Sequence, residues 1–216
     1  MTISSANRLK IYNDALQTHL GERATTLTED RKPRRLLDAV WDRGGIDECL
    51  GAGQWSFAKR LQQIDYNPSI TPAFGYAYAF DLPSDWVQTT GLCSDDHMNA
   101  PILSMSMDAN YIYCDLQTIY LEYISNDSAY GGDYSRWSNE FIRFVGAYFA
   151  SQIVYPLTQS RDDQKKLMDI VDKLKTDAQS SDAMNQGPKF APAGSWVQSR
   201  SGQLNVRDRT GRSLIG

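Results

Sequence analysis

The spacing of the apolar residues changes twice along the chain. Over residues 1–54 they recur every three or four positions, over 55–124 they alternate with small or polar residues, and after 133 the spacing of three or four returns. The first spacing is typical of amphipathic helices and the second of strands. The order predicts an α+β fold: a helical bundle of about four helices, from residues 1–54 and 133–178, with an inserted small antiparallel β-domain at 55–132.

Capping residues place the first two helices. The Ser4-Ser5 pair can start the first helix and Gly21 can end it. Asp30 is expected to cap the second helix, with Pro33 in its first turn. The Gly44-Gly45 pair should kink or fray that helix, because each glycine costs about 1 kcal/mol relative to alanine in a helix.

The last two helices are followed by a segment without periodicity. An aromatic stripe over 137–149 marks the third helix, and Pro156 should interrupt it because proline cannot donate the backbone hydrogen bond. Ser160 can cap the fourth helix, which is expected to end near Ala178. Residues 179–216 contain glycine and proline but few apolar residues, and we expect an extended C-terminal arm there.

Four to six short strands are expected between about 55 and 124. The alternating segments are 55–61, 76–80, 86–89, 103–107, 111–114 and 118–123. A short polar loop, Asp108-Ala109-Asn110, separates two of them and predicts a hairpin. The β-domain should therefore be a small antiparallel sheet or barrel.

The aromatic residues are concentrated in the middle of the chain. Of 24 Phe, Trp and Tyr residues, all but Tyr12, Trp41, Phe190 and Trp196 lie between 55 and 155. The main core should form there. The arm cannot build a core of its own, so Phe190 and Trp196 can be buried only against another surface.

Two features bear on location. No run of about 18 apolar residues exists, which excludes a transmembrane helix, and the first residues lack the basic and apolar regions of a secretory signal. The three cysteines, Cys49, Cys93 and Cys114, are widely spaced, as expected for free thiols in a reducing cytoplasm.

The charge is unevenly distributed. The net charge is −4, but residues 189–216 carry five cations against Asp208 and sum to +4, which leaves −8 for the rest of the chain. Four of these cations are Arg200, Arg207, Arg209 and Arg212. An acidic body argues against a nucleic-acid clamp, because such proteins carry an excess of cations that displace counterions.

No catalytic motif is present, so we predict no catalytic residue, cofactor or metal. The densest polar cluster, Cys93-Ser94-Asp95-Asp96-His97, holds metal-ligand types, but consecutive residues rarely converge on one ion, and a solvated loop is the favoured interpretation. His19 lies at the end of the first helix, where a cation is favoured by the helix dipole, and is interpreted as structural.

The densest basic run is interpreted either as a solvated face or as a surface that meets acidic residues of a partner. It comprises Arg31, Lys32, Arg34 and Arg35, around the start of the second helix. Cations at such a place more often form a solvated face or meet acidic residues than bind DNA. The tyrosine-rich strands are likewise expected to form core and subunit interface, because no cations are interleaved with them as in a base-stacking surface.

The order of several short motifs resembles the head-to-tail adaptor proteins of short-tailed bacteriophages, the tail tubular protein A-like family. The motifs are Tyr12-Asn13-Asp14-Ala15-Leu16, Leu20-Gly21-Glu22, Arg35-Leu36-Leu37, Val40-Trp41-Asp42, Leu50, Trp55-Ser56-Phe57-Ala58-Lys59-Arg60, Phe80-Asp81-Leu82-Pro83-Ser84-Asp85-Trp86, the helix over 137–153, Leu157-Thr158-Gln159-Ser160, the polar helix that ends near Ala178, and Ser195-Trp196-Val197-Gln198-Ser199-Arg200. Together they span most of the chain, while residues 90–101 and the last dozen match nothing in the family.

The resemblance implies a structural virion protein. Family members form a ring, expected to be dodecameric, below the portal protein, with the tail nozzle protein on the far side and double-stranded DNA passing through the lumen without specific binding. The protein would be assembled in the host cytoplasm and lie in the neck of the virion. The C-terminal arm, through Phe190, Trp196 and the four arginines, would dock on the portal or on a neighbouring subunit.

Two alternatives come from other functional classes. A tail-associated cell-wall glycan hydrolase would use acidic residues such as Glu122 or Glu140, although paired carboxylates can be assigned only from a measured separation. A non-viral protein-binding module would use the aromatic face of the sheet as its partner surface. A glycan hydrolysis assay and the presence of closed rings separate these alternatives from the adaptor.

Overall fold

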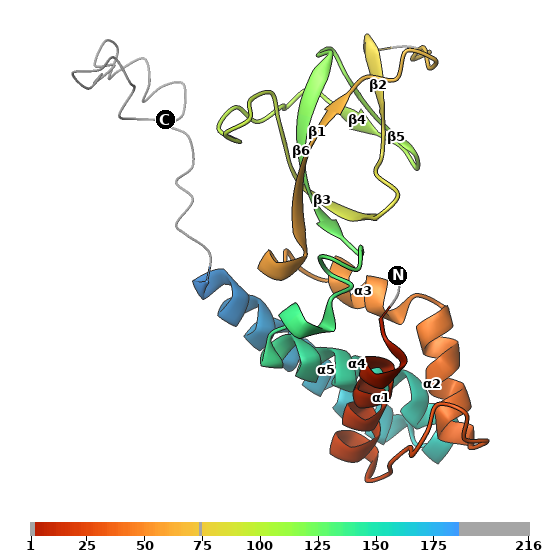
Figure 1. The fold of residues 1–216 in the computed structure, drawn as a ribbon. Helices are drawn as coiled ribbons and strands as arrows, with labels where there is room; N and C mark the ends of the chain where they lie inside the picture. The colour runs from red at the N-terminus through yellow and green to blue at the C-terminus, as the bar shows by residue number, and fades with distance from the viewer. Residues whose placement is uncertain (1–2, 74, 186–216) are drawn as a thin grey trace.

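The computed structural model describes residues 3–73 and 75–185, and Figure 1 shows their arrangement: a β-domain stands on one end of a helical bundle. The helices are α1 (Ser5–Leu20), α2 (Lys32–Asp42), α3 (Gly45–Gly51), α4 (Asn139–Thr158) and α5 (Arg161–Met184), with the short 3-10 helices η1 (Ser56–Ala58) and η2 (Tyr134–Arg136). The strands are β1 (Lys59–Asp65), β2 (Tyr78–Asp81), β3 (Trp86–Cys93), β4 (Ser106–Met107), β5 (Tyr111–Cys114) and β6 (Thr118–Ser125). The predicted α+β class is confirmed.

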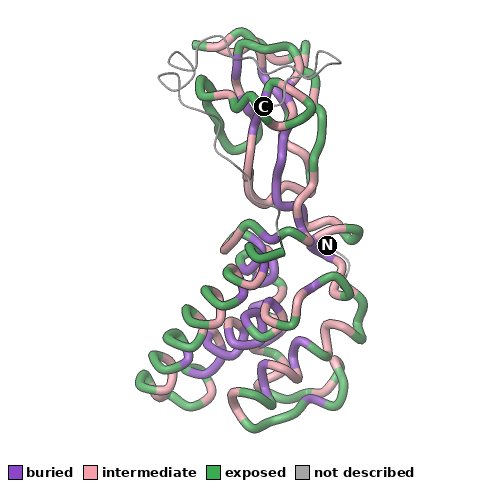
Figure 2. Tube along the Cα trace, turned by 90° about the vertical axis from the view of Figure 1, so that its left-hand side faces the viewer, coloured by how far each residue is buried: buried purple, intermediate pink, exposed green. Residues whose placement is uncertain are grey.

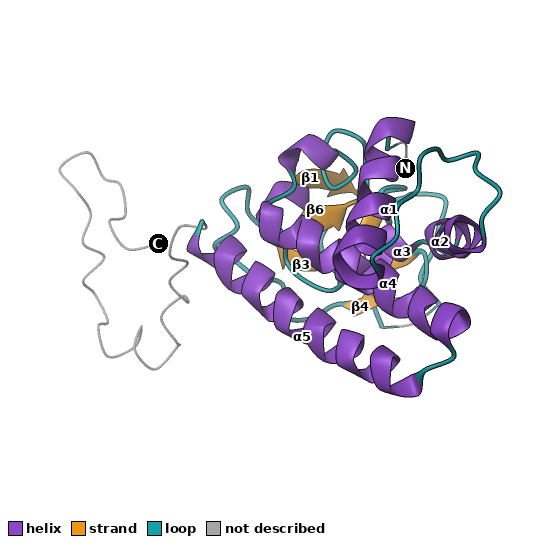
Figure 3. Ribbon diagram, turned by 90° about the horizontal axis from the view of Figure 1, so that it is seen from below, coloured by secondary structure: helices purple, strands orange, loops and turns teal. Residues whose placement is uncertain are grey.

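The bundle is organised around α4. This helix contacts each of the other four, and α5 lies along the outside of the bundle (Figure 3). Helix α4 has apolar side chains around most of its circumference, because other helices pack against it on nearly every side. Its buried apolar residues are Phe141, Phe144, Val145, Ala147, Phe149, Ala150, Ile153 and Val154.

The β-domain contains two three-stranded antiparallel sheets, in the orders β1-β6-β3 and β2-β5-β4. Two register shifts bend β3, and an isolated bridge between Cys93 and Pro101 ties the end of β3 to the segment that leads to β4. A second core fills the space between the sheets. It is formed by Phe80, Leu92, Ile112, Cys114, Ile119, Leu121 and Tyr123. Figure 2 shows buried stretches both in the β-domain and in the helices below it.

Several helix ends are confirmed. Ser4 caps α1 by accepting a hydrogen bond from the backbone N–H of Asn7, and Gly21 ends it in the left-handed conformation with φ of 68°. Ser160 caps α5. The glycine pair separates two helices instead of only kinking one: α2 ends at Asp42, Gly44 has φ of 90°, and α3 starts as a separate helix. The described residues therefore contain five α-helices, one more than predicted.

The predicted starts of α2 and β1 are wrong. Arg31, not Asp30, holds the N-cap position of α2, and Asp30 instead pairs with Arg35 at 3.5 Å. Trp55 and Phe57 precede β1, which starts only at Lys59. Trp55 leaves the alternating pattern because its ring packs on Phe141 of α4 at 4.7 Å between ring centroids.

Two predictions for the last helices are also wrong. Pro156 does not end α4, which continues to Thr158, because a proline in the last turn removes only one hydrogen bond and the helix stops at Gln159, in the left-handed conformation. Helix α5 continues six residues beyond Ala178, since Asp182 is buried against the start of the β-domain. The predicted arm at 179–216 therefore begins as helix, and its residues from 186 onward lie outside the described residues.

Gly131 lies where the chain returns from the β-domain to the bundle. A Cβ atom at this position would overlap the carbonyl oxygen of Ser125 and lie 3.1 Å from both Ala58 Cβ and Leu50 Cδ1. We expect Gly131→Ala to lower the free energy of unfolding by about 2–3 kcal/mol, because a tightly packed site cannot accept an added methyl group. Urea denaturation measures it. The matched control is Gly51→Ala, whose Cβ would meet Val87 at an ordinary 3.6 Å; equal losses in both variants would contradict the packing argument.

Candidate functional site

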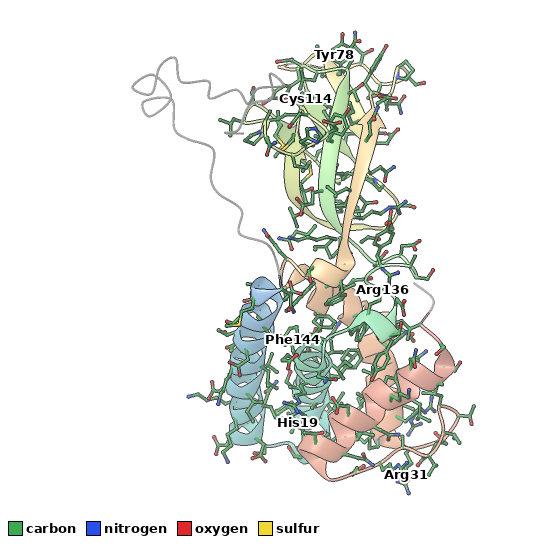
Figure 4. All side chains as sticks on the ribbon, turned by 60° about the vertical axis from the view of Figure 1, so that its left-hand side comes forward. His19, Arg31, Tyr78, Cys114, Arg136 and Phe144 are labelled. Carbon is green, nitrogen blue, oxygen red and sulfur yellow. The ribbon has the colours of Figure 1, made fainter. Side chains whose placement is uncertain are left out.

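The predicted basic run lies at the end of the bundle remote from the β-domain, where Figure 4 labels Arg31. All four cations have partners within the chain. Arg31 pairs with Glu29 at 2.6 Å, and Arg35 pairs with Asp30. Lys32 donates to the carbonyl oxygen of Pro156 at 2.6 Å.

Arg34 is the most deeply placed of these cations and belongs to a network between α1 and α2. It pairs with Asp38, whose other carboxylate oxygen accepts hydrogen bonds from Arg8 at 2.6 Å and from the buried Tyr12 hydroxyl at 2.7 Å. The guanidinium of Arg8 also lies over the ring of Trp41. Arg34 therefore stabilises the packing of α2 on α1 through Asp38. That the basic run faces a partner stays a prediction, and Arg31, Lys32 and Arg35 are its exposed members.

The residues of the C-terminal arm that were predicted to dock on a partner lie outside the described residues. These are Phe190, Trp196, Arg200, Arg207, Arg209 and Arg212. The structure therefore leaves the docking role of the arm as a prediction.

The polar loop after β3 is organised by its own backbone. The Asp95 carboxylate accepts hydrogen bonds from the backbone N–H groups of Asn99 and Ala100, whereas Cys93 is buried and His97 is exposed. Their side chains thus diverge. Across residues 3–73 and 75–185, no group of three or more His, Cys, Asp or Glu side chains is arranged to hold a metal.

The remaining candidates have structural surroundings. Glu122 forms an ion pair with Lys59 at 3.4 Å, and both side chains are largely buried. Glu140 lies in the first turn of α4, where a carboxylate is favoured by the helix dipole. His19 lies in the last turn of α1 as predicted; burial lowers its pKa, against an opposing effect of Asp14, so the imidazole is less easily protonated than a free one.

A polar cluster that the sequence analysis missed ties β1, β6 and the turn before β3 together at the base of the β-domain. Asp85, in the turn before β3, accepts hydrogen bonds from Arg60 of β1 at 2.8 Å and from the Tyr123 hydroxyl of β6 at 3.1 Å, and it also bonds the Ser125 hydroxyl. Burial alone would raise the pKa of Asp85, but the hydrogen bonds from Ser125, Arg60 and Tyr123 outweigh it and hold the pKa below its ordinary value of 3.8. The turn itself was predicted; nothing in the sequence indicated that its carboxylate faces inward.

Helix α5 is hydrogen-bonded to the segment of the chain that precedes β1. The Asp182 carboxylate accepts hydrogen bonds from the backbone N–H of Ser56 at 2.9 Å and from its hydroxyl at 2.6 Å, and Gln179 donates to the carbonyl oxygen of Ala52 at 2.8 Å. The last turns of α5 thus fix the segment that leads into β1. This contact also explains why α5 is longer than its apolar spacing predicted.

The structure divides the charge of the chain sharply. The β-domain, residues 55–132, has nine carboxylates and only two cations, a net charge of −7, whereas the bundle residues 1–54 and 133–185 sum to −1. Lys59 and Arg60 are the two cations, and each is paired within the domain, with Glu122 and Asp85 respectively. The seven other carboxylates have no cation of the β-domain left to balance them, and the surface of this domain is therefore strongly negative.

No protein-family model matches the chain, and a search of curated proteins finds no matching relative. In the part of the chain that the structure describes, no helix has both the length and the apolar character needed to cross a bilayer.

The Asp85 cluster predicts a pH dependence. Because its pKa is lower in the folded protein than its ordinary value, Asp85 stabilises the fold above about pH 4 and this contribution is lost as the pH falls further and the carboxylate is protonated. We expect Asp85→Ala to lower the free energy of unfolding by about 3 kcal/mol at neutral pH, and the difference from the wild type to shrink as the pH falls below about 4. Urea denaturation at several pH values measures it. A difference that stays constant with pH would contradict the assigned role.

The Asp182 contact predicts that two truncations differ. A chain that ends after Asn185 retains the whole of α5, whereas a chain that ends after Gln179 loses the two hydrogen bonds to Ser56. We expect the shorter chain to be less stable by about 2 kcal/mol. Thermal unfolding of the two proteins measures it, and equal midpoints would show that the contact adds nothing.

Proposed function

We propose that this protein is a head-to-tail adaptor of a short-tailed bacteriophage. In this proposal, copies of the chain form a closed ring, dodecameric as in the family that the sequence resembles. The ring joins the portal protein to the tail nozzle protein in the neck of the virion and lets double-stranded DNA pass. The role is structural, without a cofactor or a catalytic step, and the C-terminal arm contributes to docking on the portal or on a neighbouring subunit.

Two findings support the proposal beyond the motifs. The fold is a helical bundle with an inserted antiparallel β-domain, which is the architecture that the resemblance implies. The observation that carries most weight is the concentration of charge: a domain of net −7 projects from a bundle of net −1. A ring around DNA must not hold the phosphates, and a negative surface repels them within about 10 Å, the Debye length at ordinary salt.

The surroundings of the acidic residues favour a structural role over a hydrolase. Glu122, one of the two candidates for catalysis, is held by Lys59 on the sheet of the β-domain, and Glu140 starts a helix of the bundle. A general acid for glycoside hydrolysis needs a raised pKa and a second carboxylate across the scissile bond. A hydrolysis assay on purified protein with peptidoglycan tests this preference, and glycan cleavage would refute it.

The decisive experiment mixes the purified full-length chain with its portal protein. We expect closed rings bound to the portal by electron microscopy and a single defined stoichiometry by native mass spectrometry. A chain that ends after Asn185 retains every residue that the structure places in the two cores and should stay folded, but it should lose portal binding. Full binding by the truncated chain would contradict the role of the arm, and the absence of rings with the full-length chain would contradict the adaptor itself.

A further inference from the structure

A groove of about 330 Å³ lies on the outside of the β-domain, between the loop that precedes β2 and the β4–β5 hairpin. Pro72 and Ala73 line it on the loop side, together with Tyr76. Ser106, Asp108 and Tyr113 line it on the hairpin side. The volume is at the lower end of what small-molecule sites occupy and is sufficient for a few side chains of a peptide.

The carboxylate in the groove is held in place as an anion. One oxygen of Asp108 accepts hydrogen bonds from the backbone N–H groups of Asn110 at 2.9 Å and Tyr111 at 2.8 Å, and the other accepts one from the Tyr113 hydroxyl at 2.8 Å. The bond from Asn110, then those from Tyr113 and Tyr111, lower the pKa of Asp108. A fixed carboxylate in a groove that two tyrosines, Tyr76 and Tyr113, also line is an environment that a guanidinium group prefers, because Arg pairs with the carboxylate and stacks on aromatic rings.

The groove lies beside an edge strand. Ser106, which lines the groove, belongs to β4, the last strand in the order β2-β5-β4. An edge strand offers backbone hydrogen-bonding groups to an added chain. The groove and this edge together suit an extended peptide that carries arginines.

The C-terminal sequence of the chain has this composition. Between Arg200 and Arg212 it contains four arginines, with Leu204 and Val206 interspersed, and residues 186–216 sum to +4 against −7 for the β-domain. Helix α5 delivers the chain to the base of β1, where Asp182 bonds Ser56. The 15 residues from Asn185 to Arg200 span up to about 50 Å when extended, which exceeds the length of about 23 Å of a seven-residue strand such as β1.

We propose that this groove binds the segment 200–212 of its own chain, with an arginine side chain between Tyr76 and Tyr113 and paired with Asp108. The tether favours the contact within one molecule, because a short linker gives a millimolar effective concentration. In the free protein the segment is thus held on the acidic β-domain and partly neutralises it. The inference rests on the groove and the charges and does not depend on the adaptor role.

A photo-crosslinking experiment on the full-length chain tests the proposal. The residue p-benzoylphenylalanine is placed at Ala73, on the loop side of the groove, so that Asp108 and the two tyrosines stay intact. After irradiation, mass spectrometry should find the crosslink in peptides from 200–212. A mixture of ¹⁵N-labelled and unlabelled protein should give crosslinks within one isotope only. Mixed-isotope crosslinks, or crosslinks confined to other parts of the chain, would overturn the proposal.

Charge variants provide the matched controls. Asp108→Asn removes the charge but keeps the oxygen that accepts the two backbone hydrogen bonds, so the hairpin remains folded; we expect the crosslink yield to fall roughly five-fold, the equivalent of one ion pair. The double variant Arg207→Gln and Arg209→Gln should lower it similarly from the other side of the contact. Asp65→Asn, the same change on an exposed residue of β1 outside the groove, should leave it unchanged. Unchanged yields in Asp108→Asn and in the double arginine variant would overturn the assigned contact.

Discussion

Adjacent residues of β6 belong to different cores, and the two-part architecture depends on this. Successive side chains of a strand point to opposite faces; Tyr123 is buried in the core of the β-domain, whereas Ile124 is buried in the core of the bundle. The strand therefore cannot shift by one register without exposing both side chains. Asp85 reinforces the same point, because it bonds Tyr123 and Ser125 on either side of Ile124.

The charges of the β-domain are arranged relative to its junction with the bundle, that is, the start of β1 and the end of β6. Each of the two cations of the β-domain lies in the first two residues of β1, next to the bundle, and each is paired there. Beyond the junction the domain holds only carboxylates among its Lys, Arg, Asp and Glu residues. Mutual repulsion of these carboxylates opposes folding, and it is tolerated because the apolar core between the sheets and the bonds at Asp85 hold the strands together. A surface that is maintained at such a cost is best understood as functional.

The sequence predicted what local periodicity and capping determine. The five confirmed strand segments from 76 onward and the caps at Ser4, Gly21 and Ser160 are decided by neighbours within a few residues. The predictions failed where contacts with residues far away in the sequence determine the local structure. Trp55 leaves its strand pattern for Phe141, and α5 continues to bury Asp182 against Ser56. The same holds for the candidate site. The sequence showed the basic run as a cluster of charges, but the pairing of Arg34 with Asp38 and the inward position of Asp85 depend on contacts made only in the folded chain.

The charge division also bears on how the ring proposed above would assemble. A free chain whose −7 domain and +4 segment lie on the same molecule reduces its own long-range field, so that copies meet with less repulsion than the charge of the domain alone would give. Once the segment binds elsewhere, the full negative surface is restored. In a ring this would occur where the surface is needed, next to DNA. Release of the segment 200–212 from the groove and exposure of the acidic surface of the β-domain are then one equilibrium. A partner that captures the segment must bind it more tightly than the groove does.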